Sequence, residues 1–399
     1  MSKLEDFVIP IAKPWLGDRE AAAAARPILS GWVTQGPEVA AFEKEFAVSV
    51  GARHACAVAN CTTALHLALL ALGVGADDEV ITVSHSFIAT ANSIRYCGAV
   101  PVFVDIEPAT FNIDPLKIEA VITARTKVIL CVHQVGMPCD LAAIIDIARR
   151  HGLRVIEDAA CATGSEIRWN GRWDKIGKPH GDIACFSFHP RKVVTTGDGG
   201  MITTSNEDWD RQFRLLRQHC MDVPDVVRHG SRTVVFESYP SLGFNYRMTD
   251  IQAAIGLEQL ARLPEILSRR RALAERYKSL LADVSGIRVA EEPEWARSNW
   301  QSFCIWLPAG TDQRQSMQRM LDAGIATRRG VMCSHREAAY PRATWTCGAL
   351  ACECRAGTCA RLLQSERAQD GSIMLPLFAQ MTYEEQDRVV AALRDVLRS

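Results

Sequence analysis

Short runs of strand-forming residues alternate with helical patterns from Ala55 onward, and this alternation restricts the possible folds more than any other feature of the chain. It predicts an α/β fold with a large, mostly parallel mixed sheet that helices cover on both faces. In such a sheet ligands collect at the carboxyl ends of strands, where Asn60, Asp158 and the segment after Phe188 are expected. The expected strands are Ala55–Ala59, Glu79–Val83, Val100–Asp105, Val128–His133, Arg154–Asp158, Ile183–Phe188 and Met201–Thr204. The expected helices are Thr62–Leu72, Pro115–Thr123, Leu141–His151 and Glu207–His219.

The pattern changes in the last third of the chain. Thr249 begins a capping box that predicts a helix start, and Pro264 is expected to end this helix before a second one begins. Another capping box at Thr382 predicts the last helix. We therefore expect a large domain over residues 1–275 and a smaller α/β domain over residues 276–399. The smaller domain is expected to hold strands at Ile287–Ala290, Phe303–Leu307 and Ile325–Arg329 and a helix at Gln313–Ala323.

Composition argues against several classes of protein. A chain of 399 residues can bury a large core without disulfides or a metal. With 45 Lys and Arg against 46 Asp and Glu, the chain lacks the general basic field of many nucleic-acid-binding proteins. We see no secretory signal and no apolar run of the ~20 residues that a membrane span needs. Several of the 14 cysteines stand singly in apolar segments, which favours a reducing cytoplasm.

The segment IACFSFHPRKVVTTGDGG, which begins at Ile183, carries the sharpest chemical signal. Most lysines are exposed and solvated, but Lys192 follows a nearly apolar strand and precedes a glycine-rich loop. A partly desolvated lysine loses its proton more readily and can form a Schiff base. The loop glycines allow the backbone to approach a ligand closely.

Asp158, in VIEDAACATG, is expected at the end of a buried strand. A carboxylate there is rarely unpaired, because burying a free charge is costly. It either caps a helix or forms a structural ion pair, or it binds the protonated nitrogen of a pyridine ring. A Schiff-base lysine together with an aspartate that binds the ring nitrogen is the signature of a pyridoxal phosphate (PLP) site.

Such a cofactor also needs a phosphate site and a surface against its ring. Between Asn60 and Ala64 a strand passes into a helix, whose first amides and the Thr62 hydroxyl can hold a dianion, although Asn60 could serve only as a cap. Ser187 offers a second hydroxyl. Phe87 could stack on the ring or belong to the core.

At this point the sequence resembles the DegT/DnrJ/EryC1/StrS family of PLP-dependent sugar aminotransferases, which have fold type I of the aspartate aminotransferase superfamily. The resemblance covers nearly the whole chain. The segments that carry it include NCTTALHLALLALGVGADDEVITVSHSFIATANSI, GAVPVFVDI, HQVGMPCDL, EDAACATGSE, SFHPRKVVTTGDGG, FNYRMTDIQAAIGLEQL, RRGVMCSH and LPLF. Several long motifs in the same order make the resemblance specific.

The resemblance implies a role for each cofactor-site candidate. Lys192 becomes the catalytic Schiff-base lysine, Asp158 the partner of the pyridinium nitrogen and Phe87 the stacking residue. Asn245, otherwise a turn residue, would reach the cofactor phosphate of a neighbouring subunit, which implies a homodimer with shared active sites. The residues expected to bind the phosphate are Cys61, through its backbone, Thr62 and Ser187.

Two positions depart from the family pattern. Cys161 stands where the family often has Gln or His in contact with the 3′-oxygen of the ring, which weakens that expected contact. Cys61 stands where Gly or Ser is common, and this change is tolerated if only the backbone amide binds phosphate.

Candidates for substrate contacts rest on weaker patterns. His189 and His335 could contact substrate or relay a proton, although a lone histidine more often has a structural role. Arg247 and Arg329 could pair with a carboxylate or a nucleotide phosphate. The family resemblance places Trp32 and Thr34 in a turn at the mouth of the active site.

Four cysteines gather in TCGALACECRAGTCA, between Cys347 and Cys359. Four thiols this close could bind zinc, but the spacing differs from the usual paired Cys-x-x-Cys arrangement. The sequence therefore favours a cysteine-rich surface insertion without a metal. The two other members of the group are Cys352 and Cys354.

The family resemblance implies a ping-pong transaminase that takes an amino group from L-glutamate and delivers it to a keto group, expected at the 4-position, of a nucleotide-linked deoxysugar. Lys192 would move a proton between the donor Cα and the cofactor. Three alternatives stay open: a keto-cyclitol aminotransferase, a PLP-dependent sugar dehydratase and a regulatory protein. Dehydratase relatives carry His in place of the lysine, so Lys192 argues against the second, and the intact Lys192–Asp158 pair argues against the third.

Overall fold

The computed structural model describes residues 8–223, 233–234, 236–348, 354–355 and 357–398. Its centre is a seven-stranded mixed sheet in the order β1-β9-β8-β5-β4-β2-β3. All pairs from β8 to β3 are parallel, whereas β9 runs antiparallel to both β8 and β1, which confirms the expected mostly parallel mixed sheet. The strands are β1 (His54–Val58), β2 (Glu79–Val83), β3 (Val100–Val104), β4 (Thr126–Val132), β5 (Arg154–Asp158), β8 (Ile183–Ser187) and β9 (Gly200–Thr204).

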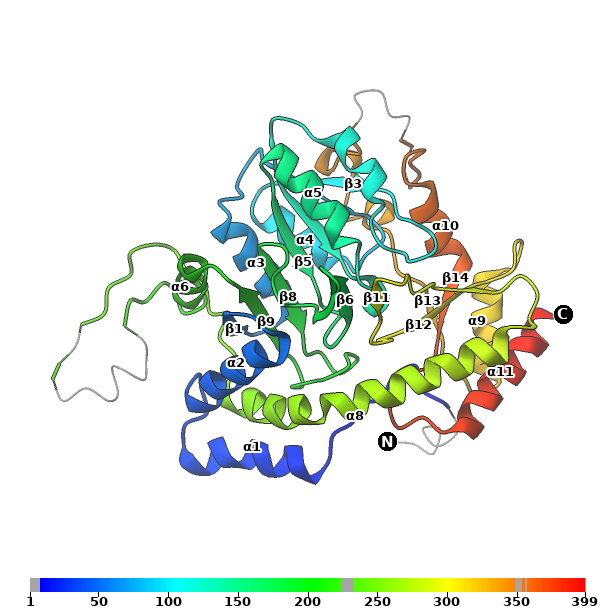
Figure 1. Ribbon diagram of the computed structural model, residues 1–399, viewed down its shortest axis with the longest axis horizontal. Coiled ribbons are helices and arrows are strands. Elements are labelled where there is room, and N and C mark those ends of the chain that lie inside the picture. The colour runs from blue at the N-terminus through cyan, green and yellow to red at the C-terminus, as the bar shows by residue number, and fades with distance from the viewer. Residues whose placement is uncertain (1–7, 224–232, 235, 349–353, 356, 399) are drawn as a thin grey trace.

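Helices cover this sheet on both sides (Figure 1). The first two were not assigned from sequence, although each begins after a glycine and ends at a glycine with left-handed backbone (Gly31 at φ 79° and Gly51 at φ 76°). Both pack against α8. The helices of this half are α1 (Asp18–Ser30), α2 (Pro37–Val50), α3 (Cys61–Ala71), α4 (Ala89–Tyr96), α5 (Leu141–His151) and α6 (Glu207–Leu216).

Two sequence expectations about helices are wrong. The stretch expected as one helix at Pro115–Thr123 forms two short 3₁₀ turns, Pro115–Lys117 and Glu119–Val121. Its β-branched residues disfavour a longer helix, and Ile122 already has extended backbone with ψ at 132°. A third 3₁₀ turn lies at Gln134–Gly136.

Pro264 does not end a helix. A single helix, α8 (Asp250–Leu281), runs through it for 32 residues. A proline inside a helix costs about 3 kcal/mol, but Leu263 and Ile266 on either side of it are buried in the main core. Burying such side chains stabilises by about 1.5–3 kcal/mol each, which is enough to keep the helix continuous.

The C-terminal half of α8 packs with α11 over a four-stranded sheet in the order β10-β12-β14-β13 (Figure 1). A second buried apolar cluster, which includes Leu273, Tyr277 and Val389, fills the space between them. The strands are β10 (Arg288–Val289), β12 (Phe303–Trp306), β13 (Arg328–Arg329) and β14 (Ser372–Leu375), and the helices are α9 (Gln313–Asp322), α10 (Leu363–Gly371) and α11 (Tyr383–Leu397). Short 3₁₀ turns lie at Ser334–Arg336 and Arg342–Thr344.

A third sheet of three short strands, β11-β6-β7, lies beside the main sheet. Its strands are β6 (Glu166–Trp169), β7 (Arg172–Lys175) and β11 (Ala296–Arg297). The division at residue 275 stays a prediction: α8 runs through it, and Ile9 pairs with Ile325 far along the chain. No helix in the described part of the chain combines the length and the apolar character that a bilayer span requires.

Candidate active site

The candidate cofactor residues lie where neighbouring elements of the main sheet end. Asp158 is the last residue of β5, and Ser187 is the last residue of the adjacent strand β8. Cys61 begins α3, which follows β1. After β8 the chain makes a turn in which the Lys192 amide donates to the His189 carbonyl at 2.8 Å, and this turn carries the Lys192 side chain back toward the site.

Lys192 is half-buried, and its Nζ atom donates a hydrogen bond to Cys161 Sγ at 3.1 Å. Burial lowers the pKa of Lys192, but Cys161, Cys61 and Asp158 more than offset this effect, so its pKa lies above the ordinary value. The surroundings of Lys192 therefore favour its protonated form in the chain alone. The contact also places Cys161 in the candidate site, even though Cys161 replaces the usual Gln or His.

Asp158 is only 4% exposed, and both of its oxygen atoms accept hydrogen bonds. Thr90 Oγ1 donates to Oδ2 at 2.7 Å, and the Ala160 amide donates to Oδ1 at 3.1 Å. Burial raises the pKa of Asp158, while Thr90, Ala160 and Lys192 pull it back down. A buried carboxylate in this position is best stabilised by a nearby positive charge, which a protonated ring nitrogen would supply.

The sequence predicts a phosphate site at the start of α3, and this helix start has the geometry of an anion site. Asn60 caps the helix by accepting from the Thr63 amide at 3.0 Å, so the backbone amides of Cys61 and Thr62 lie in the first turn with the positive end of the helix dipole. Gly200 packs so closely here that a Cβ atom on it would lie 2.8 Å from the Cys61 amide nitrogen. Only glycine allows β9 to approach the helix start in this way.

The residues present fit the expected PLP group. A lysine, a buried carboxylate, a helix N-terminus and the Ser187 hydroxyl come from elements that end at the same edge of the sheet. Phe87 follows β2 and is 65% exposed, so its ring is accessible to a bound ligand and does not belong to the core. An exposed aromatic ring at this edge is what stacking on a cofactor requires.

Asn245 is exposed, in a segment that pairs with Gln218 and leads into α8. Its neighbours Phe244 and Tyr246 stack on each other with ring centroids 4.8 Å apart. The stacked rings and the pairing with Gln218 therefore hold the backbone of Asn245 in place while its side chain stays exposed. This position leaves it accessible to a second subunit, and its predicted phosphate contact stays a prediction.

The turn that holds Trp32 and Thr34 is tied to the start of α8. The buried Asp250 carboxylate accepts from the Gly36 amide at 2.7 Å and from the Val39 amide at 3.0 Å, and the Asp250 amide donates to the Thr34 carbonyl at 3.2 Å. Sequence reasoning missed Asp250 as an anchor, because its partners lie more than 200 positions away, 214 in the case of Gly36.

Three further candidates for substrate contacts differ in burial and in their contacts. His189 is half-buried in the turn before Lys192, where its Nδ1 atom accepts from the Arg191 amide at 3.3 Å. Arg247 lies just before α8, whereas Arg329 is exposed in β13 and pairs with Glu337 at 3.8 Å. Arg247 therefore stands three residues before Asp250, whose amide donates to the Thr34 carbonyl of the Trp32 turn.

His335 is buried, and both of its ring nitrogens have partners. Nδ1 lies 2.7 Å from Ser84 Oγ, and Nε2 lies 3.1 Å from Glu366 Oε1. These contacts fasten the segment after β13 to the end of β2. The structure therefore favours the structural role for His335 over a substrate contact.

Three cysteines of the C-terminal group do not form a surface insertion. Cys347 and Cys359 are each 1% exposed, and Cys354 is half-buried. They pack with Phe103 and other apolar residues beside the main sheet, so the expectation of a surface location is wrong for them. Cys352 lies outside the described residues.

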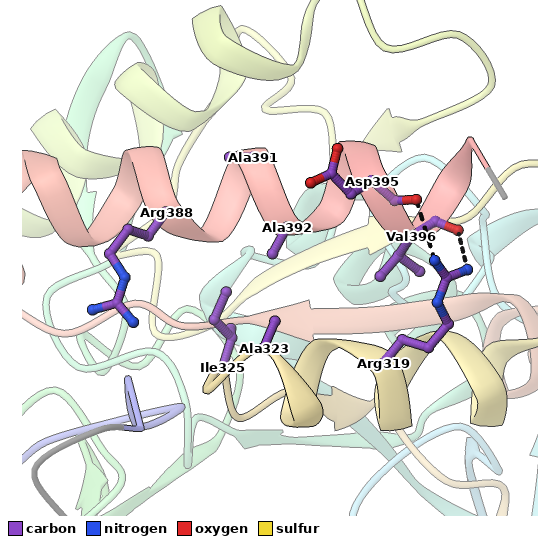
Figure 2. A pocket seen from close by; sticks show the side chains of 8 residues that line it. All are labelled: Arg319, Ala323, Ile325, Arg388, Ala391, Ala392, Asp395 and Val396. Carbon is purple, nitrogen blue, oxygen red and sulfur yellow. Dashed lines mark hydrogen bonds between the residues drawn. The ribbon is translucent and has the colours of Figure 1, made fainter.

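Figure 2 shows a pocket of about 380 Å³ between α9 and α11, away from all these residues. Arg319 rises from α9 and donates to the carbonyl oxygens of Val396 at 3.1 Å and Asp395 at 3.4 Å. A cation at this position stabilises the C-terminal end of α11. We interpret the pocket as a packing groove of the small sheet region.

Comparison with known proteins gives consistent results. The sequence model of the DegT/DnrJ/EryC1/StrS aminotransferase family matches residues 15–394. A protein from Caulobacter vibrioides named GDP-perosamine synthase is 41% identical over 395 residues, covering 98% of both chains. Among solved structures, the aminotransferase TlmJ from Streptoalloteichus hindustanus is 31% identical with a TM-score of 0.86, covering 98% of this chain and 99% of that one. The putative sugar aminotransferase Spr1654 from Streptococcus pneumoniae, in its PMP form, is 25% identical with a TM-score of 0.88, covering 98% of each chain.

Proposed function

Because the chain belongs to the DegT/DnrJ/EryC1/StrS aminotransferase family, we propose that it moves an amino group from L-glutamate to the 4-keto group of a nucleotide-linked deoxysugar. The family makes it a PLP-dependent sugar aminotransferase with fold type I. The family does not establish the amino donor, the nucleotide or the position of the keto group, and these three are our proposal. The GDP-perosamine synthase relative suggests GDP as the first nucleotide to test.

One observation carries the proposal: Lys192, Asp158, Cys161 and the start of α3 come together where the strands of the main sheet end, and Lys192 Nζ donates to Cys161 Sγ at 3.1 Å. Their convergence beside a helix N-terminus is the arrangement that PLP chemistry uses.

The residues divide the work as follows. The bound cofactor supplies an electron sink for the charge that develops at the amino donor carbon. Asp158 holds the positive charge of the ring nitrogen, and Thr90 fixes the orientation of the Asp158 carboxylate. The first amides of α3, with Thr62 and Ser187, hold the phosphate, and Phe87 fixes the plane of the ring.

Lys192 would act as the base that takes the proton from the donor Cα and delivers it to the cofactor in the first half-reaction, and it would move a proton from the cofactor to the acceptor carbon in the second. It must lose its own proton to do so. Asp158 and Cys161 raise the pKa of Lys192 in the chain alone. When the ring nitrogen binds the Asp158 carboxylate, Asp158 stabilises the lysine cation less, and the amine becomes a better base.

A nucleotide diphosphate needs donors outside the cofactor site. Arg247 and the Trp32–Gly36 turn flank the start of α8, and the Asp250 carboxylate holds this turn in place. The Arg247 guanidinium, beside a turn that is held in place, can bind a diphosphate by paired hydrogen bonds. We keep Arg329 as a second candidate from β13.

The free keto-sugar should be a far poorer acceptor than its nucleotide-diphosphate form. Binding the remote nucleotide helps to orient the reacting carbon, so removing it should lower kcat as well as affinity, by about 10²-fold or more in kcat/KM. A panel of keto-sugars assayed with glutamate, following release of 2-oxoglutarate, measures this difference. Arg247→Ala should reduce the preference for the nucleotide form, whereas Arg314→Ala, on the distant helix α9, serves as the matched control.

The same panel separates the alternatives. Equal activity on both sugar forms, or preference for an unphosphorylated keto-cyclitol, would replace the nucleotide-sugar proposal by the cyclitol one. Dehydration without release of 2-oxoglutarate would indicate a dehydratase. A cofactor absorbance band without turnover on any acceptor would favour a regulatory protein.

We further propose a cytoplasmic homodimer with shared active sites, supported by the exposed Asn245 and by the free thiols of Cys56, Cys131 and Cys185, which stand singly in buried strands. Mixing Asn245→Ala with Lys192→Ala subunits should restore part of the activity, because some heterodimers regain one intact site. Activity assays after subunit exchange check this. If exchange is shown, and Asn245→Ala alone is nearly inactive, then a mixture with no recovered activity rules out sharing.

A further inference from the structure

Thr346, directly before the C-terminal cysteines, pairs with the edge of the main sheet. The Phe103 amide donates to the Thr346 carbonyl at 2.7 Å, and the Thr346 amide donates to the Pro101 carbonyl at 3.1 Å. Thr346 thus pairs in parallel with the edge strand β3. Cys347 follows directly and is buried against that edge.

A tight turn brings two further cysteines together. Arg355 and Thr358 pair through two backbone hydrogen bonds of 3.1 Å each, and Gly357 takes the left-handed backbone that the turn needs, with φ at 77°. Cys354 and Cys359 stand directly outside this pair and therefore face each other. The turn therefore brings the thiols of Cys354 and Cys359 close together, although their spacing in the sequence is not the usual one of a metal site.

The three thiols converge on one point. The Sγ atoms of Cys347, Cys354 and Cys359, here called the thiol cluster, lie within 4.8 Å of one another. Sγ of Cys354 lies 3.8 Å from that of Cys347 and 3.0 Å from that of Cys359. In a tetrahedral site with Zn–S bonds of about 2.3 Å, sulfur atoms lie about 3.8 Å apart. The first separation matches this value, and the second needs to widen by less than about 1 Å.

We propose that the thiol cluster binds a structural zinc ion, which holds the cysteine segment against the edge of the main sheet. The expectation of no metal rested on the sequence spacing and on a chain long enough to fold without a metal, and the turn between Cys354 and Cys359 removes the first of these arguments. A fourth ligand, from solvent or from outside these three residues, would complete the tetrahedron.

The surroundings of the thiol cluster suit this role. Phe103, Tyr340 and Trp345 pack around Cys347 and Cys359 and keep water away. The Cys359 amide donates to Glu366 Oε1, which also contacts His335.

These contacts connect the thiol cluster to the active-site edge. His335 contacts Ser84, just beyond the end of β2, and Phe87 lies three residues further on. A zinc ion would therefore stabilise the segment that orients Phe87 without touching the cofactor. This inference concerns stability and does not depend on which sugar the enzyme aminates.

The holoenzyme, purified in reducing buffer and dialysed against metal-free buffer, should retain about one zinc ion per chain by elemental analysis. Cys354→Ser should abolish retention and lower Tm, because Cys354 is the half-buried member and serine is close to it in size. Cys97→Ser, at another half-buried cysteine outside the cluster, should retain the metal and serves as the matched control.

Replacement of the metal in the wild-type protein by cobalt gives a second measurement that needs no variant. Thiolate-to-cobalt charge-transfer bands with tetrahedral d–d bands support the proposal. Wild-type protein that neither retains nor takes up zinc or cobalt overturns it, and so does full zinc retention by a folded Cys354→Ser variant. A disulfide between cluster cysteines in the reduced protein, seen as a mass lower by two hydrogens, also overturns it.

Discussion

Lys192→Ala should leave the protein folded and able to bind PLP, but unable to transfer amino groups. General acid–base catalysis alone contributes about 10²–10⁴-fold, and this variant also loses the covalent attachment, so we expect kcat to fall by about 10³-fold or more. In the wild-type protein, borohydride reduction followed by peptide mass mapping should place the pyridoxyl group on Lys192. Labelling of a different lysine would show that the assignment is wrong.

Lys127→Ala provides a matched control for this loss. Lys127 is an exposed lysine that pairs with Asp78 at 2.8 Å at the opposite end of the sheet from the site, near the start of β4. Its replacement should leave the cofactor absorbance and kcat unchanged. Equal losses in the two variants would point to general destabilisation and not to a role in catalysis.

The main sheet could be predicted well from the sequence because its central strands are buried on both faces. Such strands appear as continuous apolar runs, as in VITV before Ser84 and VILCV before His133. The direction of β9 could not be predicted in the same way. The direction in which β9 pairs depends on β8 and β1, which lie elsewhere in the sequence. The apolar residues of β9 would fit a parallel neighbour as well as an antiparallel one.

Local signals also failed where distant packing decides the structure. Pro264 is a helix breaker by its own chemistry, but the core contacts of Leu263 and Ile266 keep α8 continuous. In the cysteine segment, spacing suggested an exposed insertion. Pairing of Thr346 with β3 and the turn before Cys359 bury the thiols instead.

Within the candidate site, sequence motifs identified the residues that carry chemistry but not those that position them. Lys192 and Asp158 stand out because a charged group beside an apolar strand is unusual. Thr90 gave no such signal, because a threonine at the start of a helix is common and its partner Asp158 lies 68 positions away. Asp250 was missed for the same reason.

Asp158→Asn should reduce activity by about 10²–10³-fold, mainly in kcat. The amide keeps the size of the side chain but cannot neutralise a positive ring nitrogen, and removing one member of a buried charge pair costs about 3–5 kcal/mol. Cofactor retention after gel filtration should fall as well, which gives a readout independent of turnover. Unchanged kcat and cofactor retention would remove Asp158 from the proposed role.

Thr90→Val tests how far the effect of Asp158 depends on its orientation. This variant leaves the carboxylate in place and removes the Thr90 hydroxyl, whose 2.7 Å hydrogen bond is worth about 1.5–3 kcal/mol to a charged acceptor. The same hydroxyl also contacts Ser86 Oγ at 2.8 Å. We therefore expect a loss in kcat of roughly tenfold to a hundredfold, with the asparagine variant always the worse of the two. The matched control is Thr82→Val on β2: Thr82 is fully buried, and its hydroxyl has no hydrogen-bond partner among the described residues. Because valine has the same shape and buries no polar atom there, Thr82→Val should keep full activity and equal or greater stability, so that a loss confined to Thr90→Val comes from the hydrogen bonds of the Thr90 hydroxyl.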